Sequence, residues 1–475
     1  MEHLEQQDPP RDPEVSLEHG HTSLGALTVL GLSAQQIGPG IALAGGYMIL
    51  YAGNASWVSM LVALVVSASI GAIVVTFSRR LVASGGLMSY VSSVLGPYGR
   101  ALTGSGYLIG LLIAAAAVTT GVVIFTASFL VQIGATWAAS PLAQGASAVV
   151  IAVLAGAIAY RGVDTSVKVS AVLTFVGIPF VIWVTLAAAL AAPHYSIAPQ
   201  FDFSSSDFSW SGIFQGALVA LSYFVGFDGL SAMAGETKDP KKNLPRFILL
   251  LLGITGAAYV AILWFQIPAL AGGTKLLENG DSPTAVLAHL GNVGWLAAPL
   301  DLLMAAATFA GLVATFNYGS RIIGTAAEAR LLPRGLAHVN PRFRSPSRAV
   351  IFLVIISAGI PIAFELVAAT PPLESSVLLY TLFSYCYFIP YVVAAVAAIV
   401  LVVRERRANP LMIAVYAFAG ISFGYLLFYA LTSAGGGAFG ALPWIALILT
   451  AVGFVGLLIV DRRSAGAGEA LSDLL

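Results

Sequence analysis

Two short stretches of this sequence place helix-breaking residues beside groups that can bind a charged small molecule. A Gly-Pro-Gly triplet at residues 38–40 lies inside a segment, residues 24–78, that contains no charged side chain. Further along, Gly226 and Gly229 bracket a lone carboxylate, Asp228. Glycine adds backbone freedom and proline removes an N–H donor, so both residues interrupt helices. The two ends of a broken helix carry opposite partial charges, which suit a carboxylate and an ammonium group.

The elements around these stretches are apolar helices. The chain has 475 residues, of which 58% are hydrophobic and only 9% are Asp, Glu, Lys or Arg. About a quarter of the residues of a soluble globular protein are charged. A helix needs roughly 20 apolar residues to cross a bilayer, and the chain contains many charge-free runs of that length or longer. The composition therefore predicts an all-α, multi-pass membrane protein.

We predict twelve transmembrane helices. The expected spans are residues 25–51, 55–78, 98–131, 145–160, 167–192, 211–236, 246–271, 296–327, 349–367, 375–403, 410–432 and 441–461. Basic residues favour the cytoplasmic side of a membrane. With this count, all 22 Lys and Arg except Lys275 fall on one side. This distribution predicts that both termini are cytoplasmic and that the protein resides in the cell membrane.

The two interrupted spans, the first and the sixth, are five spans apart. Two five-span units would therefore enter the membrane in opposite directions. Paired broken helices at corresponding positions of inverted repeats indicate the central site of a secondary transporter. The predicted organisation is a disordered tail at 1–23, one repeat at 24–192, a second repeat at 211–403, two further spans at 408–461 and a tail at 462–475.

The broken helices predict how a substrate would be held. We expect the outer half of the first span to begin near Gly40 and Ile41, whose N–H groups would bind a carboxylate. The carbonyls of Phe224 and Val225 would bind an ammonium group, so an α-amino acid fits both ends. The alternative for each break is a kink that only serves packing. The predicted substrate-binding residues are Ile37, Gly38, Gly40, Ile41, Phe224, Val225, Phe227 and Asp228.

Four stretches resemble the amino acid–polyamine–organocation permeases. The segment "FVGFDGLSAMAGETKDPKKNLPR", Phe224–Arg246, is similar to that family's Phe-Gly-Phe-Asp signature with its later Pro-Arg. Ile37–Ile41 resembles Ile-Gly-Ser-Gly-Ile, and "SGGLMSYVSSVLGPYG", Ser84–Gly99, is similar to the segment before span 3. Arg321 and "RLLPRGLAHVNPRFRSPSRAV", Arg330–Val350, look like the Arg-x-Leu-Pro loop before span 9.

The resemblance covers roughly residues 24 to 405. It implies a five-plus-five inverted-repeat fold with alternating access, and it implies a gating role for Phe227. Three departures stand out. Pro39 replaces the family's usual serine, and Gly177 stands where many proton-coupled members have a lysine. Glu328 to Arg330 replace Arg-Asp-Gly, so a contact of the inner gate is expected to differ.

Four charged residues are candidates for gating or coupling in addition to Phe227. A charge at mid-bilayer costs about 2.5–3.5 kcal/mol on insertion scales, so such residues are usually functional. Asp228 either contacts the substrate ammonium or carries a coupled proton, or else it caps the inner half-helix through the N–H groups of Leu230 or Ser231. Asp301 either lines an outer vestibule or is a solvated helix start. Glu236, at the inner end of the sixth span, either forms an ion pair that holds an inner gate shut, with Arg321 or Arg79 as its partner, or belongs to a solvated loop.

The most specific interpretation is a secondary active transporter for amino acids, as a symporter or antiporter. The alternatives are a polyamine or organocation transporter and a nutrient sensor that does not transport. Coupling to protons or sodium is open, with Thr308 and Thr315 as candidate sodium ligands or as hydroxyls bonded to their own helix. No metal-binding, cofactor-binding, nucleic-acid-binding or catalytic pattern is visible, so we expect neither cofactor nor enzymatic activity.

Overall fold

The computed structural model describes residues 20–278, 282–364, 372–433 and 438–472. These residues form helices joined by turns, and they contain no strand beyond one isolated β-bridge. Nine helical segments among them are long and apolar enough to cross a membrane, and two shorter apolar helices accompany these. The predicted all-α class and multi-pass character are confirmed. The count of twelve spans stays a prediction. Two of the expected spans, 211–236 and 349–367, correspond to the shorter helices Trp210–Leu221 and Ser347–Ile362.

From residue 20 onward, the first part of the chain contains seven helices. They are α1 (Leu24–Ala34), α2 (Ile37–Ala52), α3 (Ser56–Ser78), α4 (Leu87–Gln132), α5 (Pro141–Tyr160), α6 (Val163–Phe175) and α7 (Ile178–Ala191). A kink at Gly96, where φ is 65°, divides α4 into two helical parts.

In the second part, the described residues form nine helices and one important 3₁₀ segment, η5 (Phe227–Met233). The helices are α8 (Trp210–Leu221), α9 (Pro240–Leu270), α10 (Thr274–Glu278), α11 (Pro283–Leu290), α12 (Ala297–Glu328), α13 (Ser347–Ile362), α14 (Pro372–Arg404), α15 (Pro410–Ser433) and α16 (Ala438–Ser472). The end of the ninth expected span, residues 365–367, lies outside the described residues.

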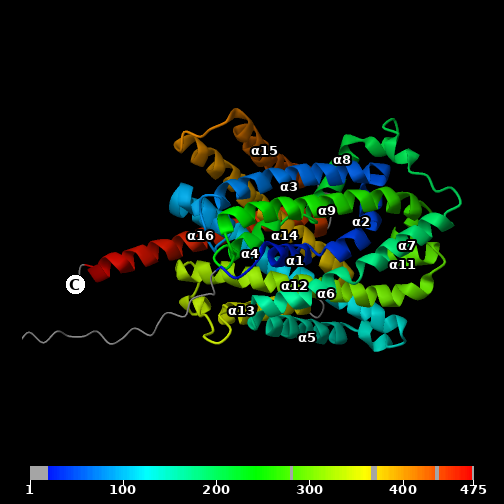
Figure 1. Ribbon diagram of the computed structural model, residues 1–475, viewed down its shortest axis with the longest axis horizontal. Coiled ribbons are helices and arrows are strands. Elements are labelled where there is room, and N and C mark those ends of the chain that lie inside the picture. The colour runs from blue at the N-terminus through cyan, green and yellow to red at the C-terminus, as the bar shows by residue number, and fades with distance from the viewer. Residues whose placement is uncertain (1–19, 279–281, 365–371, 434–437, 473–475) are drawn as a thin grey trace, which may run out of the picture.

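Most of the long helices run along one axis of an elongated bundle (Figure 1). The α4 helix is the most buried of the candidate spans, whereas α15 and α16 are largely exposed at the edge. The last turns of α16 extend past the bundle at one end. Large apolar side chains such as Leu190 and Val452 are exposed on the outside. An apolar exterior is what a bilayer requires, because lipid tails are as apolar as the protein core.

The first helix break lies earlier than we expected. Helix α1 ends at Ala34, Gln36 adopts a left-handed conformation with φ 49° and ψ 49°, and α2 begins at Ile37. We expected the outer half to begin near Gly40, and this position is wrong. The reason is that Pro39 is suited to a first helical turn, where its fixed φ fits and its missing N–H has no intrahelical partner to lose. Proline therefore starts this helix instead of breaking it.

The second break is where the sequence predicts it. Helix α8 ends at Leu221, Gly226 has a φ of 86°, and the chain resumes as η5 at Phe227. A φ of this sign is accessible to glycine at little cost. The predicted interruption of the sixth span near Gly226 is confirmed.

A proline kink divides the fifth expected span and was missed, although the backbone at Val176 and Gly177 stays right-handed helical. Helix α6 ends at Phe175 and α7 begins at Ile178, with Pro179 in its first turn. Proline cannot donate the backbone hydrogen bond that would continue the preceding helix. The sequence carried this signal at Pro179, but the surrounding apolar run concealed it.

Close packing of α4 against α14 gives a first testable prediction. A Cβ on Gly106 would lie 2.4 Å from the carbonyl oxygen of Cys386, whereas one on Gly424 in α15 would meet nothing within 4 Å. We expect Gly106→Ala to lower stability by about 1–3 kcal/mol through overpacking. Gly424→Ala should be neutral or stabilising, because alanine favours helix over glycine. Thermal unfolding in detergent measures both, and equal effects would contradict the predicted packing.

Candidate functional site

The two helix breaks face each other and are joined by a hydrogen bond. The side-chain amide Nε2 of Gln35 donates to the carbonyl oxygen of Phe224 at 3.2 Å. The Gln35 carbonyl in turn accepts from the hydroxyl of Tyr259 in α9 at 3.1 Å, and the Tyr259 ring lies 5.7 Å from that of Phe224. Irregular backbone at membrane depth requires such partners, because hydrocarbon offers none.

The beginning of α2 presents backbone donors at the first break. Its first amides, those of Ile37 and Gly38, precede the first intrahelical bond, which Gly40 makes to the Gln36 carbonyl at 2.7 Å. First-turn amides lack an acceptor within their own helix. The expectation that Gly40 offers a free N–H is therefore wrong, and the donors lie earlier, at Ile37 and Gly38. Pro39 follows them with no N–H to offer.

A buried glutamine links α2 to the helices behind it. Gln266 of α9 donates to the Ile41 carbonyl at 2.9 Å and accepts from the Gly45 amide at 3.0 Å. It also donates to the Thr185 hydroxyl of α7 at 3.2 Å. Ile41 thus takes part through its carbonyl and not through the N–H that the sequence suggested.

At the second break, the backbone carbonyl expected to bind the substrate ammonium already accepts hydrogen bonds. The Phe224 carbonyl accepts from Gln35 and also from the Phe227 amide at 3.3 Å. Its oxygen is therefore not the free ammonium acceptor that we expected. Phe224, Val225 and Phe227 are all buried, at 0%, 5% and 1% exposure.

Two tyrosine hydroxyls donate hydrogen bonds to the carboxylate of Asp228. Its Oδ2 accepts from the Tyr107 hydroxyl of α4 at 2.8 Å, and its Oδ1 accepts from the Tyr391 hydroxyl of α14 at 2.7 Å. The Tyr391 oxygen also accepts from the Gly226 amide at 3.0 Å. Asp228 is fully buried. Through Tyr391, the carboxylate is linked to the left-handed residue of the break.

Asp228 does not cap the inner half-helix, which was the alternative to a functional role. Within the described residues, its side chain forms no hydrogen bond to the amides of Leu230 or Ser231, and η5 has no side-chain cap. The two hydroxyls satisfy the carboxylate instead. Hydrogen bonds to an ionised acceptor are stronger than bonds between neutral groups.

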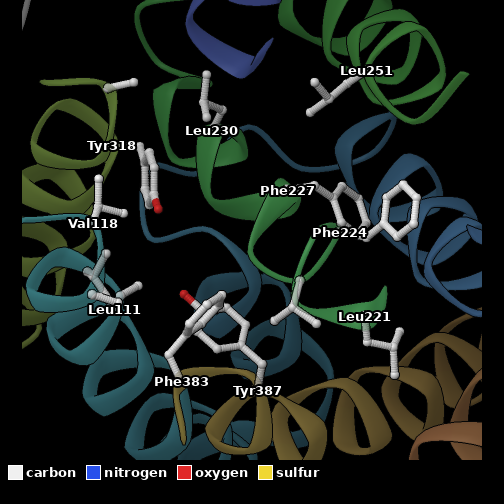
Figure 2. Packing of buried hydrophobic residues seen from close by; sticks show 14 of the residues in the cluster. Leu111, Val118, Leu221, Phe224, Phe227, Leu230, Leu251, Tyr318, Phe383 and Tyr387 are labelled. Carbon is white, nitrogen blue, oxygen red and sulfur yellow. The ribbon is translucent and has the colours of Figure 1, made fainter. Parts of the chain in front are cut away.

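Aromatic side chains surround the second break (Figure 2). Phe224 and Phe227 lie on one side of η5 and Tyr318 of α12 on the other, with Phe383 and Tyr387 of α14 facing the break. A Cβ on Gly71 would lie 3.9 Å from the Phe227 ring, so this ring packs toward α3. The gating role that the resemblance implies for Phe227 stays a prediction.

A buried ion pair lies at one end of the site. Arg321 of α12 donates to both carboxylate oxygens of Glu236, and the Nη2 to Oε2 distance is 2.9 Å. Arg321 also donates to the Asn317 carbonyl at 2.7 Å. The side chains of the pair are only 1% and 3% exposed. The solvated-loop alternative for Glu236 is wrong, since its charge and that of Arg321 are buried against each other.

The segment before α1 lies against the same end. The Thr22 amide donates to the Glu236 carbonyl, and the Lys238 amide donates to the Thr22 carbonyl, both at 2.9 Å. This is the isolated β-bridge of the structure. It holds residues before the first helix directly over the ion pair.

The opposite end of the site contains the other buried carboxylate candidate. Asp301 of α12 accepts from Ser128 and Gln132 of α4 at 2.5 and 2.6 Å. It is 1% exposed, and its Oδ1 has no partner among the described residues. The solvated helix-start alternative is therefore wrong. Asp301 ties α12 to α4.

The structure also shows the surroundings of one departure from the family pattern, Gly177, and of the two candidate sodium ligands. A Cβ on Gly177 would lie 2.6 Å from Met304 of α12, so a lysine would not fit there without a shift. The candidate sodium ligands Thr308 and Thr315 each donate to their own helix, at 2.8 and 2.9 Å. Among the described residues, no group of three His, Cys, Asp or Glu lies close enough together to hold a metal ion.

Sequence reasoning missed the polar residues that organise the site. Gln35, Tyr107, Tyr259, Gln266 and Tyr391 all contribute hydrogen bonds around the breaks. One signal was available, because a glutamine in a charge-free apolar run must find a partner at membrane depth. The tyrosines gave no such signal, since their rings also serve as ordinary core residues.

Comparison with known proteins places the chain in a family. The family model described as amino acid permease matches residues 23–454. An uncharacterized transporter of Mycobacterium tuberculosis is 28% identical over 408 residues, which cover 85% of this chain and 86% of that protein.

Two relatives have more specific names. The branched-chain amino acid permease of Bacillus subtilis is 27% identical over 70% of this chain and 73% of its own length. The chloroplastic cationic amino acid transporter 7 of Arabidopsis thaliana is 25% identical over 74% of this chain and 62% of its own length. With the family model matched over most of its length, this chain belongs to the amino acid permease family of transporters.

Proposed function

We propose that the protein is a secondary active transporter that carries an α-amino acid across the cytoplasmic membrane by alternating access. The observation that supports this most directly is the meeting of the two breaks through Gln35 and Phe224. Two interrupted helices that converge in a buried region offer backbone groups to a solute at membrane depth. A packing kink alone does not require the two interruptions to meet.

The polarity of the breaks supports a zwitterion. The first-turn amides of Ile37 and Gly38 would bind the substrate carboxylate, where the helix terminus is partially positive. The carbonyls near Phe224 and Val225 would receive the ammonium. The Gln35 amide now donates to the Phe224 carbonyl, so we propose that the substrate ammonium replaces this donor. The exchange would keep the carbonyl satisfied in both states.

The surroundings favour an apolar substrate side chain. Ala114 to Ala117 of α4 are buried, and they lie between Leu111 and Val118, which face Tyr318 and η5 (Figure 2). The Asp228 carboxylate already accepts two hydroxyls. A cationic side chain placed against these alanines would find no counter-charge there, and burying an unpaired charge is costly. This favours the substrate class named for the Bacillus relative over that named for the Arabidopsis relative.

Transport would require the buried site to open on alternate sides. The candidate residues around the breaks are buried, so a substrate cannot reach them without movement. We propose that Glu236 and Arg321 close the inner side, that Asp301 with Ser128 closes the outer side, and that Phe227 moves with η5. The twelve spans, the five-plus-five inverted repeat and cytoplasmic termini belong to the same proposal, as does coupling to protons or sodium.

A first prediction tests the substrate class. Purified protein in liposomes should take up labelled leucine, isoleucine or valine at least about tenfold more efficiently than lysine or arginine, because an unpaired buried charge is strongly rejected. Imposed pH and sodium gradients identify the coupling ion. Inhibition by putrescine but not by α-amino acids would instead support a polyamine transporter. Ligand-induced stabilisation without any uptake would support a sensor.

A second prediction concerns Asp228. We expect Asp228→Asn to reduce uptake at least about tenfold, because the variant loses the charge that faces the site. Tyr107→Phe and Tyr391→Phe each remove one donor and keep the carboxylate, so they serve as matched controls that retain measurable uptake. Uptake by Asp228→Asn equal to the parent at every pH would remove Asp228 from the mechanism. Equal losses in all three variants would assign it a structural role.

A third prediction concerns the inner ion pair. Glu236→Gln or Arg321→Gln alone should destabilise the protein by about 3–5 kcal/mol, because each leaves a buried charge unpaired. The double variant should be less destabilised than the sum of the single variants. If the pair is a gate, the double variant should also speed thiol labelling of Ala234→Cys, with buried Cys386 as the background. Unchanged labelling would restrict the pair to a structural role.

A further inference from the structure

A pocket of concentrated positive charge lies outside the site described above. It encloses about 340 Å³ where α3 ends and α9 begins, and its lining consists of four basic residues, one proline and one leucine. The basic residues are Arg79, Lys241, Lys242 and Arg246, and all four are exposed. No acidic residue contributes to the lining.

These four cations have no counter-charge in the described part of the chain. The ion pairs there are Arg80 with Glu405, Arg100 with Asp461 and Arg321 with Glu236. Arg80, the immediate neighbour of Arg79, is thus paired while Arg79 is not. The nearest acid along the chain, Asp239, precedes α9 and lines a different cleft.

The position of the lysines makes this arrangement unfavourable without a ligand. Lys241 and Lys242 follow Pro240 in the first turn of α9. The beginning of a helix is partially positive, so cations there oppose the helix dipole. Lys242 and Arg246 are also four residues apart, where like charges repel. An anion in the pocket would relieve both effects.

The exposed face of α9 indicates where the anion comes from. Leu249 lines the pocket and is 62% exposed, and Leu250 and Ile254 further along are 43% and 40% exposed. A Cβ on Gly253 would meet nothing within 4 Å, so the surface is open there. The basic pocket therefore continues directly into an apolar strip on the outside of a membrane helix. A free anion would leave that apolar strip uncovered, whereas the acyl chain of a lipid would cover it.

We propose that this pocket binds the phosphate headgroup of an anionic phospholipid, whose acyl chain lies along α9 past Leu249 and Ile254. Basic pockets between transmembrane helices at the cytoplasmic side are suited to such headgroups, and each Lys or Arg near an anionic surface adds to the attraction. The assignment is independent of the transported substrate. It makes the stability of this transporter depend on the charge of the surrounding lipid.

The test is lipid binding by the full chain in nanodiscs and in detergent. Titration of phosphatidylglycerol into phosphatidylcholine should raise the unfolding temperature with a saturable profile, and native mass spectrometry should show a retained phosphatidylglycerol. The triple variant Lys241→Gln, Lys242→Gln, Arg246→Gln should bind phosphatidylglycerol at least about tenfold more weakly, given three lost attractions. The matched control Arg334→Gln, Arg342→Gln, Arg407→Gln removes the same charge from exposed positions elsewhere and should bind as the parent does.

Two further experiments test the other possible occupants of the pocket, which are free phosphate and the N-terminal residues of the chain. Inorganic phosphate without lipid should not reproduce the saturable stabilisation, and if it does, the pocket is a free-anion site and the proposal fails. Residues 1–19 contain six acidic residues, so a variant without them tests whether the chain itself fills the pocket. Phosphatidylglycerol binding that appears only after this deletion would overturn the proposal, as would equal binding by the triple variant and its control. Should the triple variant fail to fold, Lys242→Gln and Arg246→Gln tested singly must each weaken binding.

Discussion

The requirement that every backbone polar group find a partner away from water determines most of this structure. Continuous helices meet it internally, and a break exposes amides and carbonyls that must be satisfied by side chains or by a ligand. At the two breaks, Gln35, Tyr259 and Tyr391 supply hydrogen bonds to the interrupted backbone. Because these partners come from α9, α14 and the opposite break, satisfying the backbone also fixes how the helices pack around the site.

Charges in the interior follow the same logic. Each buried carboxylate of the site is paired with specific donors: Asp228 with two tyrosine hydroxyls, Asp301 with a serine and a glutamine, and Glu236 with Arg321. A buried charge without such partners would be strongly unfavourable. The three carboxylates lie at the breaks and at either end of them, and each joins its own segment to a neighbouring helix. Movement between conformations would have to exchange or break these contacts, which is why they are the natural places to look for gates.

Much of the fold was readable from the sequence because it follows from composition and local chemistry. Low charge and long apolar runs predict membrane-spanning helices, and Gly226 predicts the second break because its left-handed conformation suits glycine. The first break was placed incorrectly, since the sequence pattern of Pro39 does not distinguish a residue that interrupts a helix from one that begins it. The kink before Pro179 was overlooked for a related reason, because apolar hydropathy continues across it without change.

The sequence by itself therefore determined the class of protein, the presence of interrupted helices and which charged residues lie within apolar segments. These depend on residue type and on spacing along one element, which are local properties. Only the tertiary structure decided which groups meet: Gln35 with the Phe224 carbonyl, Asp228 with Tyr107 and Tyr391, and Glu236 with Arg321. Such partners are separated by 85 to 189 residues in the chain. Their proximity arises from helix packing, which no local pattern of residues encodes.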